Sequence, residues 1–371
     1  MMTPLPMTPL PMTPLIEARG IGKVFEGGMG RADNVALRDL SLSIFAERPA
    51  ITAVVGESGS GKTTLARSLL GLATPSSGEV LYMGQDLRHL SGRQQRDFRR
   101  DVQAIFQDPY EVYNPFYRVD HVLTTPVAKF GLARSRAEGR RLIEDALRAV
   151  GLRPEEILGR FPHQLSGGQR QRIMVARAVL VRPKLIVADE PVSMVDASLR
   201  ATILTSLRRL HETLGISIIY ITHDLATAYQ VSDNIVVMYR AGVAEAGDVE
   251  LVVKAPQHPY TQLLIASIPQ VSTTRDWLDG GEDAGGRGIP AAGGCSFVPR
   301  CPVSMAACAT TVPPLFRVDP TRAAACLRLQ HAPVLDRSRL GDVLTTGAAT
   351  AEAPPARSEE GAAGARLIKA R

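Results

Sequence analysis

A glycine-rich loop separates the apolar run Ile51–Val55 from a helical stretch that starts at Lys62. Its pattern, G-x-x-x-x-G-K-T between a strand and a helix, is that of a P-loop. Glycines allow successive backbone N–H groups to face inward, and the helix adds the positive end of its dipole. The pattern predicts a polyphosphate-binding loop that consists of Gly56, Glu57, Ser58, Gly59, Ser60, Gly61, Lys62, Thr63 and Thr64.

Three side chains at the end of this loop have chemistry that suits a bound nucleotide. We expect Lys62 to reach the β- and γ-phosphates and the Thr63 hydroxyl to bind Mg²⁺. Thr64 is expected to cap the helix or to contact the α-phosphate. The loop therefore has side chains for both a polyphosphate and its metal ion.

Two carboxylates follow residues 185–188, which are apolar on both faces, as a central parallel strand should be. At the end of such a strand, Asp189 suits the Mg²⁺ shell and Glu190 suits polarisation of the attacking water. The next expected strand, residues 216–221, is followed by His223. At the mouth of a phosphate site we expect His223 to contact the γ-phosphate, although a loop histidine without that role fits the same position.

Polar and aromatic residues elsewhere have positions that suit the same site. Gln107 ends an apolar strand that begins near Ala104. In the run 165–169, Ser166 takes the N-cap place of a helix and predicts a second anion-binding helix start. Phe25, just before a glycine-rich turn, suits stacking on an adenine ring, although a half-buried strand position fits it nearly as well.

The composition sets the scale of the molecule and excludes several classes of protein. A chain of 371 residues predicts one α/β domain with an appendage, and its net charge of +6 comes from scattered basic residues. With 5% aromatic residues and no base-stacking run, it shows no nucleic-acid-binding platform. The apolar runs are shorter than a membrane span, and the N-terminus lacks the features of a signal peptide, so we expect a cytosolic protein.

The chain divides into segments of different composition. Residues 1–14 repeat Met-Thr-Pro-Leu-Pro and are expected to form a disordered leader. Residues 15–44 predict a small antiparallel sheet, and residues from about 108 to 182 predict an inserted helical region. Residues 276–294 are expected to be a linker, and residues 333–371, rich in Ala, Pro and Glu, a disordered tail.

These motifs, followed by Asp196, occur in the order known from one family. Over about residues 15–270 the chain resembles the ATP-binding subunit of an ABC transporter. Three runs narrow the resemblance to the oligopeptide, dipeptide and nickel importer branch, namely residues 107–115, 161–164 and 258–261. The chain departs from many relatives at Phe25, where Tyr is common, and at Met194-Val195, where Ala-Leu is common.

This resemblance implies an α/β fold of the P-loop NTPase type with a RecA-like core. Its expected parts are an antiparallel β-subdomain and an inserted helical subdomain within residues 15–257, and a cysteine-containing C-terminal extension at residues 258–332. The working unit would be a head-to-tail pair of subunits that encloses two ATP molecules. Gln107 would join Thr63 and Asp189 around Mg²⁺. The partner's ATP site would be completed by Leu165, Ser166, Gly167, Gly168, Gln169 and Asp196.

The activity that the resemblance implies is ATP hydrolysis that powers import of oligopeptides or dipeptides. The implied partners are a second ATPase subunit, identical or homologous, and two membrane-spanning permease subunits at the inner membrane's cytoplasmic face. An extracytoplasmic solute-binding protein would take part indirectly. Import of oligosaccharides or nickel stays open. A nucleic-acid-associated ABC ATPase is a weaker alternative, because the chain has neither a second ATPase module nor a long coiled-coil insert.

All four cysteines fall into one segment, at Cys295, Cys301, Cys308 and Cys326. They fit four unrelated buried thiols, but their clustering and a reducing compartment favour a metal site over disulfides. Zinc sites usually have short C-x₂₋₄-C pairs, whereas these gaps are wide, so we predict a [4Fe–4S] cluster. Residues 294–302 also resemble the extension of oligopeptide-importer ATPases, some of which carry such a cluster. We expect Arg300 to offset its charge and the site to lie apart from the ATP site.

Overall fold

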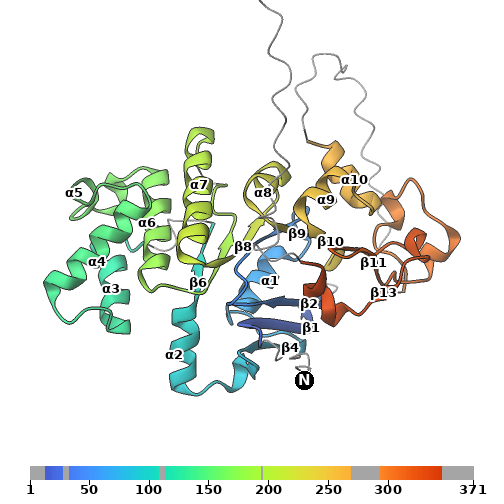
Figure 1. Cartoon of the computed structure of the whole chain (residues 1–371), viewed down its shortest axis with the longest axis horizontal. Helices are drawn as coiled ribbons and strands as arrows, with labels where there is room; N and C mark the ends of the chain where they lie inside the picture. Colours follow the sequence, from blue (N-terminus) through green and yellow to red (C-terminus); the bar gives the residue numbers. More distant parts are fainter. Residues whose placement is uncertain (1–12, 28–32, 108–112, 194, 269–292, 345–371) are drawn as a thin grey trace, which may run out of the picture.

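The computed structural model describes residues 13–27, 33–107, 113–193, 195–268 and 293–344 (Figure 1). The described chain forms a nine-stranded sheet, a smaller four-stranded sheet, and helices around them. The strands are β1 (Ile16–Phe25), β2 (Asn34–Ile44), β3 (Ile51–Val55), β4 (Ser77–Tyr82), β5 (Gln85–Asp86), β6 (Val102–Ile105), β7 (Leu185–Asp189), β8 (Ser217–Thr222), β9 (Asn234–Tyr239), β10 (Gly242–Asp248), β11 (Leu315–Asp319), β12 (Arg322–Ala324) and β13 (Val334–Leu335). The α-helices are α1 (Lys62–Leu69), α2 (Gly92–Asp101), α3 (Asp120–Phe130), α4 (Arg136–Ala149), α5 (Pro154–Ile157), α6 (Gly167–Leu180), α7 (Ala197–Leu214), α8 (Leu225–Val231), α9 (Val249–Lys254) and α10 (Pro259–Ala266).

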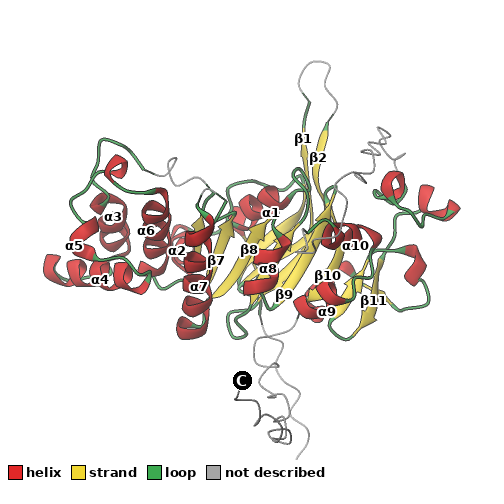
Figure 2. Ribbon diagram, turned by 90° about the horizontal axis from the view of Figure 1, so that it is seen from above, coloured by secondary structure: helices red, strands yellow, loops and turns green. Residues whose placement is uncertain are grey.

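The large sheet has the strand order β13-β11-β12-β10-β9-β3-β8-β7-β6. The five strands from β9 to β6 are parallel, and every residue of β3, β7, β8 and β9 is buried. Helices cover both faces, with α1 on one face and α7, α8 and α9 on the other (Figure 2). Parallel strands place their carboxyl ends at one edge, so the residues after β3, β7 and β8 come together there.

Two smaller units flank this sheet. The antiparallel sheet β2-β1-β4-β5 packs with α1, as expected for residues 15–44. Helices α3 to α6 form a layer beside β6, at the end of the sheet opposite the C-terminal segment (Figure 1). Among the described residues, no helix has both the length and the apolar character needed to cross a membrane.

The C-terminal extension continues the large sheet. β12 pairs with the core strand β10 in antiparallel register, and β11 and β13 add two further strands. The buried Arg322 donates to the carbonyl oxygens of Leu251 and Ala255 at the end of α9, and it pairs with Asp319 at 2.9 Å. Arg322 thus fastens the extension to the last turn of a core helix.

The predicted start of the tail at residue 333 is wrong. β13 pairs with β11, and the 3₁₀ segment η6 (Arg337–Val343) buries Leu340 and Val343 in the core that contains β1 and β2. The segment is ordered because two apolar residues three positions apart are enough to cover one face of such a turn. The Ala- and Pro-rich composition on which the prediction was based begins only after Leu344. The predicted leader up to residue 12, the linker up to residue 292 and the tail from residue 345 lie outside the described residues.

Candidate functional site

The P-loop joins β3 to α1 and curls around its own lysine. Lys62 is buried, and its Nζ donates to the carbonyl oxygens of Gly56 at 2.7 Å and Glu57 at 2.9 Å. A Cβ on Gly56 would lie 2.1 Å from the Met238 carbonyl oxygen, and one on Gly61 only 2.2 Å from that of Ala36. Both glycines also have positive φ angles, so no other residue fits this close approach to two strands.

The remaining loop residues differ in exposure. The Ser60 hydroxyl is buried and makes no hydrogen bond to the part of the chain that the structure describes. Ser58, Gly59 and Thr63 are exposed, and Thr64 is half-buried in the first turn of α1. The loop therefore presents its middle and the start of its helix to solvent, where a phosphate chain has access.

The Thr63 hydroxyl donates to the Asp189 carboxylate over 3.4 Å, at the ends of α1 and β7. Burial raises the pKa of Asp189, and the neighbouring charge of Glu190 raises it further, while the Thr63 hydrogen bond opposes both. Burial lowers the pKa of Lys62, against the charges of Glu190, Asp189 and Glu57. A hydroxyl and a carboxylate side by side are the hard oxygen ligands that Mg²⁺ prefers, so these residues fit the ion.

Glu190 lies at the centre of the carboxyl edge. Its Oε2 accepts a hydrogen bond of 3.1 Å from the Gln107 side chain, and its Oε1 lies 3.0 Å from His223 Nδ1. Its φ of 46° is unusual for a residue with a side chain, and its N–H donates to the Ile221 carbonyl at 2.9 Å. The structure thus brings Gln107, Glu190 and His223 together from the ends of three different parallel strands.

The residues predicted to act across a subunit interface lie elsewhere. Ser166 is the exposed N-cap of α6, where its Oγ accepts from the Gln169 N–H and the Gln169 side chain accepts from the Ser166 N–H. A Cβ on Gly168 would lie 2.5 Å from Leu199 Cδ1, so this glycine lets α6 approach α7. Leu165 is buried and Gly167 is half-buried.

The start of α6 belongs to the helical layer beside β6, three strands away from β3 and its P-loop (Figure 2). Asp196, the exposed N-cap of α7, and Phe25, 46% exposed at the outer end of β1, likewise face solvent. The Lys23 Nζ lies 5.2 Å from the centre of the Phe25 ring. Phe25 lies on the hairpin of β1 and β2, whose Ala36 touches Gly61 of the same chain's P-loop, whereas Ser166 belongs to the separate helical layer.

The C-terminal extension contacts the P-loop directly through Tyr260 and Arg300, and the separation of the cysteine site from the ATP site stays a prediction. The Glu57 N–H donates to the Tyr260 hydroxyl at 2.9 Å, and Arg300 Nη1 lies 2.9 Å from both carboxylate oxygens of Glu57. Arg300, expected to offset a cluster's charge, pairs with this carboxylate instead. The sequence offered no local signal for either contact, because the partners lie 203 and 243 residues from Glu57.

The four cysteines are free thiols that line one small cavity of about 20 Å³, together with residues such as His258 and Phe297. Cys308 is buried and the other three are half-buried. Burial raises the pKa of both Cys295 and Cys326, and the neighbouring thiols add to the effect. Over the described ranges, no three His, Cys, Asp or Glu side chains are grouped to hold one metal ion.

Comparison with known proteins identifies the family. Residues 37–193 match the ABC transporter family, and residues 244–308 match the oligopeptide/dipeptide transporter C-terminal region. An ATP-binding protein of Brucella ovis named for peptide import is 39% identical over 318 residues, which are 85% of this chain and 98% of that protein. The chain belongs to the ABC transporter family. OppF of Haemophilus influenzae, an oligopeptide transport ATP-binding protein, is 36% identical and covers 79% of this ABC subunit, with 89% of OppF matched.

Solved structures agree with this assignment of the ABC subunit. The dimeric cassette MJ0796, in a post-hydrolysis state bound to ADP and Pi, has a TM-score of 0.56 and 27% identity, covering 63% of this chain and 98% of that chain. The cassette cbiO1 of Clostridium perfringens has a TM-score of 0.55 and 26% identity, covering 66% and 92%. The predicted P-loop NTPase fold is confirmed, and the ABC subunit is an ATPase.

Proposed function

We propose that this ABC subunit hydrolyses ATP to power the import of oligopeptides or dipeptides through membrane-spanning partners. The observation that carries the proposal is the match of residues 244–308 to the oligopeptide/dipeptide C-terminal region. The relatives from Brucella ovis and Haemophilus influenzae, named for peptide and oligopeptide transport, support the same substrate class. The subunit would work at the cytoplasmic face of the inner membrane.

Each residue of the carboxyl edge then has a role in hydrolysis. Lys62 binds the β- and γ-phosphates, and Thr63 and Asp189 would hold Mg²⁺, which would neutralise charge on the phosphates. Glu190 polarises the attacking water, and its contacts with Gln107 and His223 fix the direction of its carboxylate. His223, at the same edge, would contact the γ-phosphate.

The second half of each ATP site comes from a second ATPase subunit. Ser166, which starts the helical layer away from its own P-loop, and Asp196 both face solvent, as residues that complete a partner's site must. Phe25 stacks on the adenine ring with its exposed face. Since only ATP is long enough to touch both halves, ATP binding closes the pair and hydrolysis releases it.

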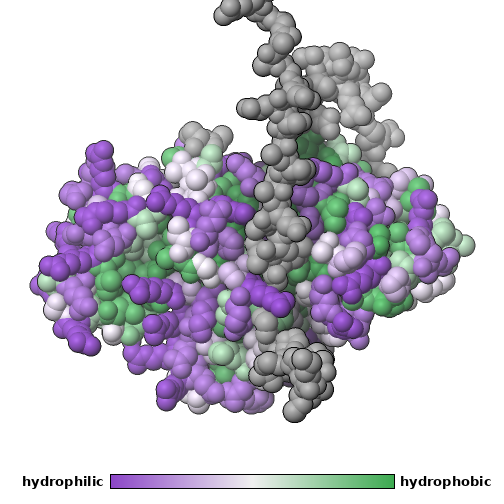
Figure 3. Space-filling view, in the orientation of Figure 1, coloured by the Kyte–Doolittle hydropathy of each residue, from purple (hydrophilic) through white to green (hydrophobic). Residues whose placement is uncertain are grey.

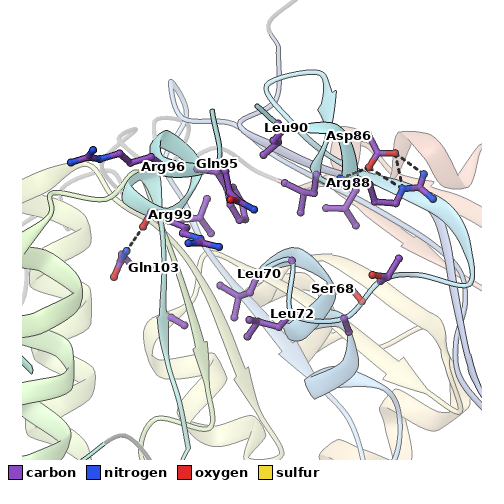
Figure 4. A pocket seen from close by; sticks show the side chains of 18 of the residues that line it. Ser68, Leu70, Leu72, Asp86, Arg88, Leu90, Gln95, Arg96, Arg99 and Gln103 are labelled. Carbon is purple, nitrogen blue, oxygen red and sulfur yellow. Dashed lines mark hydrogen bonds and ion pairs between the residues drawn. The ribbon is translucent and has the colours of Figure 1, made fainter. Parts of the chain in front are cut away.

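A groove of about 750 Å³ suits a segment of a permease partner. It lies between the end of α1, helix α2, strand β6 and helix α3, with Leu70, Leu72 and Leu90 near the charged Arg96 and Arg99 (Figure 4). In the space-filling view, apolar side chains also gather over the helical layer between charged ones (Figure 3). Since Gln103 of β6 lines the groove and Gln107 follows β6, a docked segment acts on the residue that touches Glu190.

The import proposal is tested with the ABC subunit co-expressed with its membrane partners and reconstituted into vesicles. We expect two permease subunits to co-purify and oligopeptides, presented with the solute-binding protein, to stimulate ATP hydrolysis and to accumulate in the vesicles. Stimulation by nickel chelates or oligosaccharides alone would show that the substrate class is wrong. Purification without any permease, or with bound nucleic acid, would contradict the transport role itself.

We also propose that the cysteine pocket holds a [4Fe–4S] cluster. Such a cluster distributes its four thiolate ligands over four iron atoms, so the ligands stand further apart than those of a single ion. The four thiols share one cavity, and the wide gaps between them in the sequence favour a cluster over zinc. The cluster would hold together the stretches around Cys295 and Cys326, which lie apart in the sequence of the extension.

Purification without oxygen should therefore give brown protein with iron and acid-labile sulfide in equal amounts. Both should be lost in Cys301→Ser, whereas Ser296→Ala, a neighbouring change that leaves all thiols in place, should keep them. ATP binding should persist in both variants, because no P-loop residue lines the cysteine cavity. Colourless protein with stoichiometric zinc would show that the cysteines form a zinc site. Metal-free protein would show that they are four unrelated thiols.

A further inference from the structure

Glu57 connects the C-terminal extension to the lysine of the P-loop. Its N–H donates to the Tyr260 hydroxyl, and its carboxylate pairs with Arg300, both at 2.9 Å. Its carbonyl oxygen accepts from Lys62 Nζ, also at 2.9 Å. A displacement of Tyr260 or Arg300 therefore reaches the lysine through one residue.

Tyr260 is held rigidly. It is fully buried, with its ring centre 4.4 Å from that of Tyr239 and 5.5 Å from that of Phe297. Its N–H donates to His258 Nδ1 at 2.9 Å, and burial lowers the pKa of His258 to about 4, so this imidazole is a neutral acceptor. The hydroxyl that meets the Glu57 N–H is therefore at a fixed position.

Arg300 is positioned by the cysteine segment. It ends the 3₁₀ turn η3 (Val298–Arg300), which lies between Cys295 and Cys301. Its guanidinium lies 5.9 Å from the centre of the Tyr239 ring and 5.8 Å from that of Phe297, which is buried. These cation–π contacts orient the guanidinium toward Glu57.

The negative charge of Glu57 disfavours the binding of phosphates by the P-loop that contains it. A carboxylate in a polyphosphate-binding loop repels the phosphates, unless a cation neutralises it. Arg300 supplies that cation at 2.9 Å from both oxygens of the carboxylate. Since the Glu57 side chain is 42% exposed and that of Arg300 32%, water screens the pair, and its effect on binding is modest.

We propose that Arg300 and Tyr260 are positioning residues for ATP, through which the cysteine-bearing extension sets the nucleotide affinity of the P-loop. Arg300 cancels the negative charge of Glu57 beside the phosphates, and Tyr260 fixes the backbone of Glu57 against Lys62. The proposal rests on the proposed function in one respect, that this P-loop binds ATP. No thiol chemistry is needed for it.

The test is a double-mutant cycle read out by the dissociation constant of a fluorescent ATP analogue. Arg300→Gln should weaken binding about two- to fivefold at low salt, with a smaller difference at high salt. Glu57→Gln in the Arg300→Gln background should restore the affinity of Glu57→Gln alone, because the repelling charge is gone. If the double variant stays as weak as Arg300→Gln, Arg300 acts only by packing and the proposal is overturned.

Two further variants separate positioning from folding. Tyr260→Phe should weaken binding about three- to tenfold, because the Glu57 N–H loses its acceptor. Arg328→Gln, an exposed arginine beside the same cysteine cavity, should bind ATP as the wild type does. Arg300→Gln should raise the KM for ATP and leave kcat and the Tm of the nucleotide-free protein unchanged. Absent binding by the wild type would contradict the proposed function, whereas equal binding by wild type and Arg300→Gln would contradict this inference alone.

Discussion

Glu190→Gln should bind Mg-ATP with near wild-type affinity and lose most of its turnover. The Glu190 carboxylate is aimed by Gln107 at 3.1 Å and His223 at 3.0 Å, and an amide in its place cannot take a proton from the attacking water. General-base contributions of this kind predict a fall in kcat of about a hundredfold or more. Lys62 and Asp189, the residues proposed to bind the nucleotide and its metal ion, are unchanged, so binding should persist.

The measurements are steady-state phosphate release and size-exclusion chromatography with ATP. The Glu190→Gln protein should accumulate as an ATP-bound dimer, because the bound state forms but does not decay by hydrolysis. Glu212→Gln is a matched control, since Glu212 is 58% exposed and pairs only with Arg208 on α7 among the contacts described. Near-normal hydrolysis by Glu190→Gln would show that another group polarises the water.

The carboxyl edge could be predicted from the sequence because its signals are local. The spacing of Gly56, Gly61 and Lys62 specifies a turn into a helix, and the run before Asp189 specifies a strand that ends at the carboxylates. The fold then brings these residues together, because parallel strands place their carboxyl ends at one edge of the sheet. Ser166 is a similar case, because its predicted N-cap is present with the reciprocal Gln169 contact.

The contacts of the extension could not be predicted in the same way. Glu57 and Arg300 meet because β12 extends the core sheet beyond β10, and nothing in either local sequence encodes that pairing. The wrong tail boundary has a related cause. Leu340 and Val343 form too short an apolar pattern to recognise alone, and they are buried because their segment packs on strands of both sheets.

Two surfaces outside the ATP site contact its residues through few intermediates: the proposed permease groove lies near Glu190, and the C-terminal extension lies near Lys62. Gln103 lines the proposed permease groove and lies four residues before Gln107, which touches Glu190. On the other side, Arg300 and Tyr260 reach Lys62 through Glu57. A docked permease would therefore act on the hydrolysing carboxylate, whereas the extension would act on phosphate binding, and the two influences can be separated by kcat and KM.

Ser166→Arg should abolish ATP hydrolysis without disturbing the site of its own chain. Ser166 is an exposed N-cap, so an arginine fits the fold, at a cost of about 1 kcal/mol for the lost cap. Ser166→Asp keeps the cap and places a negative charge where the partner's γ-phosphate would lie. It should therefore be equally inactive, which separates the loss from helix destabilisation.

The same residue gives a test of action across the subunit interface. In a homodimer, mixing Ser166→Arg with Lys62→Ala leaves each mixed dimer one site with both an intact P-loop and an intact Ser166. Activity should return to about a quarter of the wild-type value, since about half of the dimers are mixed. Lys62→Ala mixed with the Lys62→Ala, Ser166→Arg double variant has no intact P-loop and should stay inactive. If the first mixture gains neither hydrolysis nor ATP-stabilised association, Ser166 does not act on the partner's nucleotide.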